Sequence, residues 1–376
     1  MSAGTLRSVL LTPNLLGQDG VSSLSREIAR ALPRPAAVIS LHDPDGLPDG
    51  AEDVEMHGAG GGRGTFLAAA AAVSLRCSPA TEIVCSHLHL APAAALQAWR
   101  GGRVTAVLCG VEAWVPLRKL EAWALQRADL VAISQHTVER FKNANLAFAS
   151  TDVAVCHPGL PDLPGQPAPP ASSGPPDLPG QTAPPDQTAP PDLSPPALIV
   201  ARLSADERYK GHDELLDVWP ALLARKPDAR LIVAGDGTDR RRLERRAASL
   251  GLSHAVTFVG RVGEDELAAL YEQCRFLVMP SRDEGFGLVF LEAMRAGKAC
   301  IGANGAAEEI ICHGVTGLIV EPGERNDLAA AVFTLFDEPR TCCRFGAAGR
   351  ERFLSTFTDT CFQARFARVL ERLSTR

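Results

Sequence analysis

The chain contains 376 residues, of which 46% are hydrophobic, 22% charged and 5% aromatic. This composition is typical of a globular protein, and the length provides enough apolar residues for more than one core. The 38 basic and 44 acidic side chains give a formal charge of −6, so no overall cationic field favours nucleic acid as a partner.

The pattern of apolar residues argues against a membrane-spanning or exported protein. The longest candidate span, Phe66–Val73, is far shorter than the roughly 20 residues that a bilayer core requires. Arg7 interrupts the N-terminal stretch before the apolar region of an export signal develops. We therefore expect a cytoplasmic protein. The ten cysteines show no C-x-x-C pair, which predicts reduced thiols and no metal site.

Short apolar runs alternate with helical stretches in the first part of the chain. The runs are apolar throughout, which is typical of strands buried on both faces of a parallel sheet. We expect an α/β domain over residues 1–160. Its predicted strands are Val9–Leu11, Ala37–Ile39, Ile83–Cys85, Val104–Leu108, Leu130–Ile133 and Val153–Cys156.

Residues 161–196 have a different composition. Half of the chain's 28 prolines lie here, and large apolar residues are nearly absent. The stretch that begins at Asp162 is repeated from Asp177. Such a segment cannot form a core, so we interpret it as an extended, disordered Pro-rich linker.

The strand and helix pattern returns over residues 197–376 and predicts a second doubly wound α/β domain. Ligands of such sheets bind beyond the carboxyl ends of the strands, so we expect the site in a cleft between the two domains. The predicted strands are Leu198–Val200, Leu231–Ala234, Val256–Val259, Phe276–Met279, Ala299–Ile301 and Leu318–Val320.

An acidic motif follows the predicted strand Phe276–Met279. Gly285 and Gly287 allow a tight turn, and the helix that begins near Gly287 offers its partly positive N-terminus to a diphosphate. Glu284 and Glu292 are placed to accept hydrogen bonds from the vicinal hydroxyls of a sugar or ribose. The alternative is a plain strand-to-helix turn with solvated glutamates.

A basic segment follows the predicted strand Leu198–Val200. Arg202 and Lys210 lie near the mouth of the sheet, and Gly211 opens a helix that His212 and Asp213 would cap. Paired cations at this place suit a departing diphosphate. Isolated basic residues are more often surface charges, but their position beside the acidic motif favours the site.

Together, the E-x7-E spacing of Glu284 and Glu292, the Gly-Phe-Gly at 285–287, Arg202 and Lys210 resemble the retaining family 4 glycosyltransferases. The similarity continues through Gly235–Gly237, Phe258–Gly260, Gly305–Glu309 and Gly314–Leu318. It implies the GT-B fold, in which two Rossmann-like domains face each other across a cleft. The first domain would bind the acceptor and the second the nucleotide-sugar donor. The last helix, at about 353–373, would return to the first domain.

The resemblance also implies a role for each matching residue. Arg202 and Lys210 would bind the donor pyrophosphate, Glu284 the transferred sugar, and Glu292 the ribose. The remaining donor contacts would come from Gly20 in an early glycine loop, from Gly260 and Arg261 near the base, and from the backbone of Gly285, Phe286, Gly287 and Leu288.

Cys109 departs from the family pattern. Many relatives carry a histidine at this position, on the sugar-facing wall, and a thiol gives only a weak hydrogen bond there. Either His87 or His89 serves instead, or the chemistry proceeds without such a group. We choose His87 as the candidate catalytic residue.

Three other patterns suit structural roles. Asp43 and Asp45 form a D-x-D string, but the Pro and Gly beside them indicate a turn, and no metal is expected. The arginines of 240–246 are expected to form a solvated helix face. Leu117–Leu125 is amphipathic; packing against the first sheet is preferred over peripheral contact with a membrane or lipid-linked acceptor.

The resemblance therefore implies a retaining enzyme that moves a hexose from a UDP-sugar or GDP-mannose to a hydroxyl acceptor, in the synthesis of a glycan, polysaccharide or glycolipid. The nucleotide sugar is a substrate, and no cofactor is expected. The alternative is a nucleotide-sugar-binding protein without transfer activity.

Overall fold

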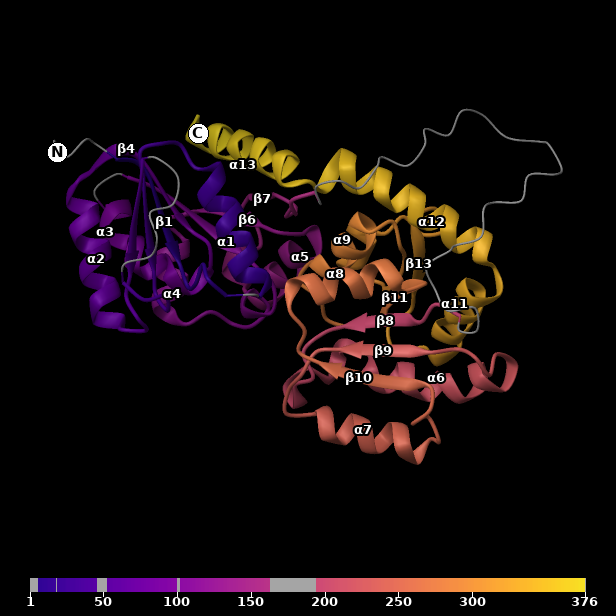
Figure 1. Cartoon of the computed structure of the whole chain (residues 1–376). Helices are drawn as coiled ribbons and strands as arrows, with labels where there is room; N and C mark the ends of the chain where they lie inside the picture. Colours follow the sequence, from indigo (N-terminus) through magenta and orange to yellow (C-terminus); the bar gives the residue numbers. More distant parts are fainter. Residues whose placement is uncertain (1–5, 18, 46–52, 100–101, 163–193, 376) are drawn as a thin grey trace, which may run out of the picture. The chain divides into compact units, whose positions relative to one another are not determined.

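The computed structural model describes residues 6–17, 19–45, 53–99, 102–162 and 194–375 (Figure 1). Most of the predicted Pro-rich linker lies outside these residues. The chain divides into two compact units. The first comprises Met1–Pro161, Glu284–Leu288 and Thr356–Arg376, and the second comprises Asp162–Asp283 and Val289–Ser355.

The first unit contains a parallel seven-stranded sheet in the order β3-β2-β1-β4-β5-β6-β7. Strand β3 was not predicted, because its polar and half-buried residues form an edge strand without an apolar run. The strands are β1 (Leu6–Thr12), β2 (Ala36–Ser40), β3 (Val54–Gly58), β4 (Cys77–Cys85), β5 (Arg103–Leu108), β6 (Asp129–Ala132) and β7 (Val153–Val155).

Local structure sets where the first and last helices of the first unit begin. The first begins at Gly20, because Asp19 caps it by accepting the backbone N–H groups of Val21 and Ser22. The last begins at Asp359 rather than near Phe353, because a π-helical turn occupies Phe353–Phe357. The helices are α1 (Gly20–Ala31), α2 (Arg63–Leu75), α3 (Ala91–Trp99), α4 (Lys119–Leu125), α5 (Gln135–Ala144) and α13 (Asp359–Ser374).

The second unit contains a parallel six-stranded sheet in the order β10-β9-β8-β11-β12-β13. All six strands match the apolar runs that predicted them. They are β8 (Ala197–Val200), β9 (Leu231–Ala234), β10 (Val256–Gly260), β11 (Phe276–Met279), β12 (Ala299–Ala303) and β13 (Gly317–Val320).

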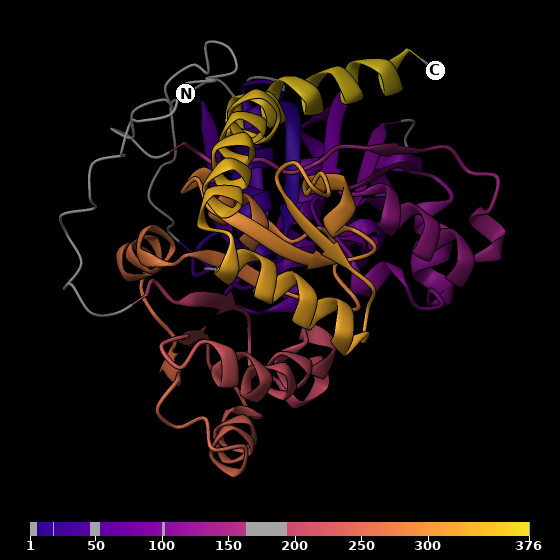
Figure 2. The same cartoon turned by 90° about the vertical axis from the view of Figure 1, so that its right-hand side faces the viewer.

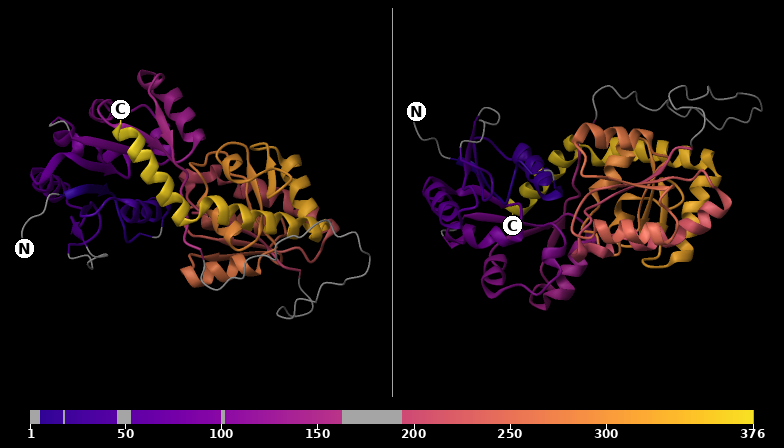
Figure 3. Two further views of the ribbon diagram at one scale, coloured as in Figure 1. Left: turned by 90° about the horizontal axis from the view of Figure 1, so that it is seen from above. Right: turned by 60° about the horizontal axis from the view of Figure 1, so that its bottom comes forward.

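Helices lie on both faces of this second sheet (Figures 2 and 3). Phe336 packs in its core, with its ring centroid 5.2 Å from that of Phe276 and 6.0 Å from that of Trp219. The helices are α6 (His212–Arg225), α7 (Arg240–Ser249), α8 (Glu264–Gln273), α9 (Leu288–Arg295), α10 (Ala307–Ile310), α11 (Arg325–Asp337) and α12 (Pro339–Arg352). Within the described ranges, every helix is too short or too polar to span a bilayer.

Each sheet has one point at which the strand order reverses. In the first unit the chain moves outward from β1 to β3 and then resumes at β4, on the other side of β1. In the second unit the same reversal occurs between β8 and β11. Doubly wound sheets bind ligands beyond the carboxyl ends of the strands at such points. The loops after β1, β4, β8 and β11 are therefore the places to look for a site.

Candidate functional site

The basic segment and the start of the acidic motif are in contact in the second unit. The segment after β8 forms a short 3-10 helix, Ala205–Lys210, and ends at Gly211, whose φ is 85°. A Cβ atom on Gly211 would lie 2.6 Å from Cγ of Pro280, which follows β11. The backbone N–H of Arg282 donates to the carbonyl of Tyr209 at 2.9 Å. The reversal point between β8 and β11 thus joins the two predicted motifs.

Both predicted cations lie in this segment. Arg202 is largely exposed and forms an ion pair with Glu207. The ammonium nitrogen of Lys210 lies 5.4 Å from the ring centroid of Tyr209. Gly211, rather than His212 or Asp213, occupies the cap position of α6.

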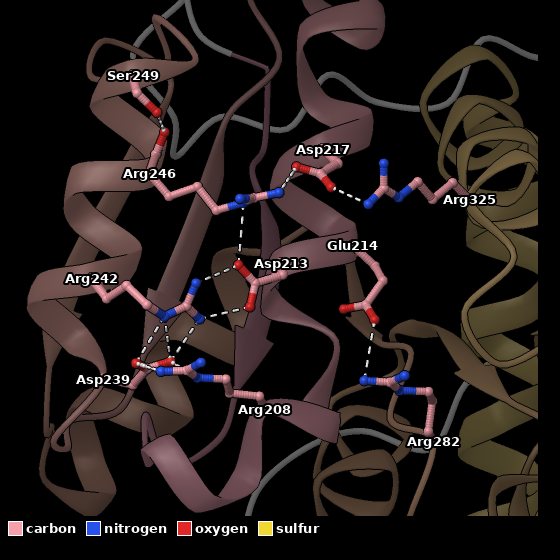
Figure 4. Close-up of polar contacts among 10 residues, drawn as sticks. All are labelled: Arg208, Asp213, Glu214, Asp217, Asp239, Arg242, Arg246, Ser249, Arg282 and Arg325. Carbon is pink, nitrogen blue, oxygen red and sulfur yellow. Dashed lines mark hydrogen bonds and ion pairs between the residues drawn. The ribbon is translucent and has the colours of Figure 1, made fainter.

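A network of ion pairs joins Arg208 and Asp213, which flank Lys210 in the sequence, to residues at and near the start of α7; Figure 4 shows these ion pairs. Asp239 accepts hydrogen bonds from Arg208 at 3.1 and 3.2 Å and from Arg242 at 2.6 to 2.9 Å. Arg242 also binds both carboxylate oxygens of Asp213, at 2.7 and 2.6 Å. These hydrogen bonds lower the pKa values of Asp213 and Asp239. Arg208 precedes Lys210 and Asp213 follows it, so the network restrains both flanks.

This network corrects the expectation that the arginines of α7 form a solvated face. Arg242 and Arg246 are only partly exposed, because Asp213 and Asp217 on α6 pair with them. Arg241 and Arg245 are exposed, as the sequence pattern indicated. Tertiary contact with α6 therefore divides the basic run into two faces.

Glu292 has a partner that the sequence analysis missed. The carboxylate lies on α9, and its Oε2 accepts a hydrogen bond of 2.7 Å from the hydroxyl of Tyr271 on α8. Burial raises the pKa of Glu292 and also that of Tyr271. The hydroxyl of Tyr271 thus orients one of the two carboxylate oxygens of Glu292.

Gly260 lies beside another residue that the sequence analysis assigned to the solvent. A Cβ atom on Gly260 would lie 2.8 Å from Nη1 of Arg240. The guanidinium of Arg240 donates to the carbonyl of Phe258 at 3.2 Å and pairs with Glu244 at 2.8 Å. The predicted base-binding loop after β10 is thus bordered by a cation.

The early glycine loop of the first unit is held by Asp43. Its carboxylate accepts the backbone N–H groups of Leu15 at 2.6 Å and Leu16 at 3.3 Å, as well as the hydroxyl of Ser40 at 2.6 Å. Asp43 is buried and therefore has a structural role in the loop. The described residues contain no cluster of His, Cys, Asp and Glu that could hold a metal ion.

Four of the predicted donor-binding residues pack within the first unit. A Cβ atom on Gly20 would lie 3.3 Å from Cδ1 of Leu288. The carbonyl of Gly285 accepts a hydrogen bond of 2.7 Å from Ser134 at the start of α5. The buried ring of Phe286 stacks on His157, with centroids 5.5 Å apart. The loop after Glu284 is therefore held at both its backbone and its aromatic side chain.

Cys109 contacts this loop through its backbone. A Cβ atom on Gly285 would lie 2.6 Å from the carbonyl oxygen of Cys109, so only glycine fits there. The thiol donates to the carbonyl of Ser86 at 3.1 Å. Burial raises the pKa of the Cys109 thiol well above its ordinary value. The thiol is therefore poorly suited to proton transfer.

The two histidines after β4 lie together, and His87 directly follows Ser86, whose carbonyl accepts from the thiol of Cys109. Their ring centroids are 4.9 Å apart, and Nδ1 of His87 accepts the backbone N–H of His89 at 3.3 Å. Burial lowers the pKa of His87, which keeps its ring neutral. With Nδ1 accepting, the proton lies on Nε2, which can donate to a ligand. His89 instead pairs with Glu121, at 2.9 Å.

A family model matches the second part of the chain. The model described as "Glycosyl transferases group 1" matches residues 186–352. The matched range contains Arg202, Lys210, Glu284 and Glu292.

Curated relatives match over a similar length. A GDP-mannose-dependent alpha-(1-6)-phosphatidylinositol monomannoside mannosyltransferase of Mycolicibacterium smegmatis is 33% identical over 186 residues, 47% of this chain and 48% of that protein. A glycogen synthase of Mycobacterium tuberculosis is 36% identical over 161 residues, 43% of this chain and 38% of that protein. The matches thus span about half of the relatives' length or less.

Solved structures resemble the whole chain. Anabaena Alr3699/HepE, in complex with UDP, has a TM-score of 0.72 at 19% identity and covers 98% of this chain and 100% of its own. A sucrose-phosphate synthase from Thermosynechococcus elongatus has the same TM-score and covers 98% of this chain and 99% of its own. The fold is GT-B. The predicted α/β architecture with two Rossmann-like domains is confirmed.

Proposed function

We propose that this protein is a retaining glycosyltransferase that moves a hexose from a nucleotide-diphosphate sugar to a hydroxyl acceptor. The main support is the contact between the basic segment and the acidic motif, through Gly211 with Pro280 and through Tyr209 with Arg282. This contact places the loop that carries Lys210 beside the start of the acidic motif, at one reversal point of a parallel sheet. A nucleotide-diphosphate sugar needs cations at its phosphates and hydrogen-bond acceptors at its sugar and ribose hydroxyls.

Each residue has a distinct role in this proposal. Arg202 and Lys210 bind the pyrophosphate and stabilise the negative charge that grows as it departs. Glu284 accepts hydrogen bonds from the sugar hydroxyls, and Glu292 from the ribose. The proposed contacts to the base are Gly260 and Arg261. The phosphates are contacted by Gly20 and by the backbone of Gly285, Phe286, Gly287 and Leu288.

The reaction we propose breaks the bond between the anomeric carbon and the diphosphate oxygen and forms a bond from the acceptor oxygen on the same face. The acceptor proton passes to the departing phosphate, so no protein nucleophile is needed. The neutral ring of His87 supplies a hydrogen-bond donor to the sugar in place of Cys109. Neither a metal nor a cofactor takes part, and the protein contributes mainly orientation and electrostatic stabilisation.

The relatives support a nucleotide-sugar donor. The Mycolicibacterium relative is named as GDP-mannose-dependent, and Anabaena Alr3699/HepE was crystallised with UDP and with UDP-glucose. We therefore keep both UDP-sugars and GDP-mannose as donors. The relatives' names include a glycolipid and a polysaccharide synthase, which is consistent with a role in the synthesis of a glycan, polysaccharide or glycolipid.

The test measures donor binding and turnover separately. Thermal unfolding with increasing UDP, GDP and their sugars should identify the donor, because a ligand of the folded state raises its stability. With that donor and mixed hydroxyl acceptors, Lys210→Ala and Glu284→Gln should lower turnover at least about 100-fold.

Arg245→Ala is the control, because this exposed arginine lies outside the site. Near-normal transfer by either Lys210→Ala or Glu284→Gln would contradict the proposal. Donor binding by the unaltered protein with neither transfer nor donor hydrolysis would favour the alternative, a nucleotide-sugar-binding protein. The immobilised thiol of Cys109 is the observation that keeps this alternative in view.

A further inference from the structure

Several large apolar side chains are exposed in a short segment after Gly110 in the first unit. Val111 is 50% exposed, Val115 53%, Leu120 61% and Trp123 39%. Leu120 and Trp123 are three residues apart on α4 and therefore share one side of that helix. The amphipathic pattern of this helix predicts packing against the sheet. That prediction is correct for Ala124 and Leu125, which are buried, and wrong for Leu120 and Trp123.

Asn145 fixes the loop that leads into α4. Its side-chain oxygen accepts the backbone N–H of Leu117 at 2.9 Å, and its amide nitrogen donates to the carbonyl of Val115 at 3.2 Å. The exposed valines and the helix thus form a held surface. We call the exposed residues Val111, Val115, Arg118, Lys119, Leu120, Trp123 and Arg127 the 111–127 surface.

The charges that this segment exposes are all positive. Arg118, Lys119 and Arg127 are exposed, whereas the two acids turn inward. Glu112 accepts the backbone N–H of Cys109 at 2.7 Å. Glu121 is buried and accepts the backbone N–H of Arg118 at 3.0 Å. A cationic surface is thus formed on a chain whose formal charge is −6.

The side chains exposed on the 111–127 surface indicate what kind of partner it contacts. The guanidinium carbon of Arg127 lies 4.7 Å from the ring centroid of Trp123, so a cation and an amphipathic ring are presented together. Exposed tryptophan and leucine bordered by lysine and arginine suit the headgroup region of an anionic bilayer. A symmetric dimer through this surface would oppose the cations of two copies, which disfavours a second copy as the occupant.

We propose that the 111–127 surface docks on an anionic phospholipid bilayer. Leu120 and Trp123 enter the headgroup region, and the cations face the lipid phosphates. Val111 directly follows Gly110, whose Cα would lie 3.1 Å from a Cβ atom on Gly285 in the acidic loop. One consequence rests on the proposed function: a bilayer bound here would present a lipid-linked hydroxyl acceptor next to the acidic loop.

Co-sedimentation of the full chain with vesicles tests the docking. The chain should sediment with vesicles of phosphatidylcholine and phosphatidylglycerol, less so at high salt, and not with phosphatidylcholine alone. Leu120→Ala/Trp123→Ala and Arg118→Gln/Lys119→Gln should each weaken this partitioning by about tenfold or more. Matched controls are Leu75→Ala, at a leucine that is 72% exposed, and Arg241→Gln/Arg245→Gln on α7; both should sediment like the unaltered chain.

Lack of sedimentation with the anionic vesicles would overturn the proposal, as would an equal loss in the control variants. A concentration-dependent dimer that only Leu120→Ala/Trp123→Ala dissociates, without vesicle binding, would assign the surface to a second copy instead. Stabilisation by the nucleotide donor should not change in the surface variants. Failure of docking and failure of the proposed transfer activity are therefore distinguishable.

Discussion

Arg242 on α7 binds both carboxylate oxygens of Asp213 on α6, at 2.7 and 2.6 Å. Asp213 lies three residues after Lys210, and Arg208, two residues before it, pairs with Asp239, which Arg242 also binds. The position of a predicted phosphate-binding cation thus depends on an arginine of a neighbouring helix. A planar guanidinium can bind two carboxylates at once, and an ammonium cannot reproduce that geometry.

Replacing this arginine should impair turnover through the position of Lys210. Arg242→Ala should lower kcat/KM for the donor by about 10- to 100-fold, because small displacements of binding groups are costly in the transition state. Arg242→Lys should recover only part of the loss. Steady-state kinetics on protein that unfolding curves show to be folded provides the measurement. Arg245→Ala, on the same helix, should behave like the unaltered chain, and equal losses in the two variants would refute the positioning role.

The contact between Tyr271 and Glu292 should control nucleotide affinity. Tyr271→Phe removes the hydrogen bond to Oε2 of Glu292, so the nucleotide Kd should rise by about 5- to 30-fold, the equivalent of about 1 to 2 kcal/mol. Calorimetric titration measures this value. In a Glu292→Gln background the additional effect of Tyr271→Phe should be small, because the two side chains act as a pair. Additive effects would show that Tyr271 acts independently of Glu292.

Gly211 should tolerate no side chain. Alanine at this position must adopt a φ of 85° and place its Cβ 2.6 Å from Cγ and 2.8 Å from the carbonyl oxygen of Pro280. Gly251 has a similar φ of 72° but nothing within 4 Å of its Cβ position. Gly251→Ala should therefore cost about 1 kcal/mol in the free energy of unfolding, and Gly211→Ala distinctly more. Denaturant titrations of both variants measure this difference. Equal losses in the free energy of unfolding would show that the contact with Pro280 is unimportant.

His212 should make the protein less stable in acid. The side chain is 6% exposed at the start of α6, and burial lowers its pKa to about 4. Below the ordinary histidine pKa of about 6.5 the unfolded chain binds a proton that the folded chain does not. The free energy of unfolding should thus fall by about 3 kcal/mol as the pH decreases from 6.5 to 4.

Comparison with a variant isolates this contribution. Unfolding curves of the unaltered chain and of His212→Gln should converge as the pH decreases through this window, because glutamine does not titrate. His254→Gln, at an exposed histidine, is the control for histidine replacement itself and should unfold like the unaltered chain at neutral pH. A constant difference between the unaltered chain and His212→Gln across the window would contradict the prediction.

The sequence alone determined the class of fold and the positions of most strands. Buried parallel strands require continuous apolar runs, and such runs are visible without a structure. The edge strand Val54–Gly58 is only half-buried and needs no continuous apolar run, so it was not predicted. The candidate site motifs, such as Glu284 with Glu292, were also visible, because their spacing is set by one turn and one helix.

Only the tertiary structure decided which side chains support those motifs. Tyr271 orients Glu292 from another helix, Asp43 holds the backbone of Leu15, and Arg242 reaches Asp213 from α7. None of these pairs is marked by local periodicity. Each depends on how helices and loops pack on a sheet, and the free energy of a hydrogen bond or ion pair depends on distances that a linear pattern does not contain.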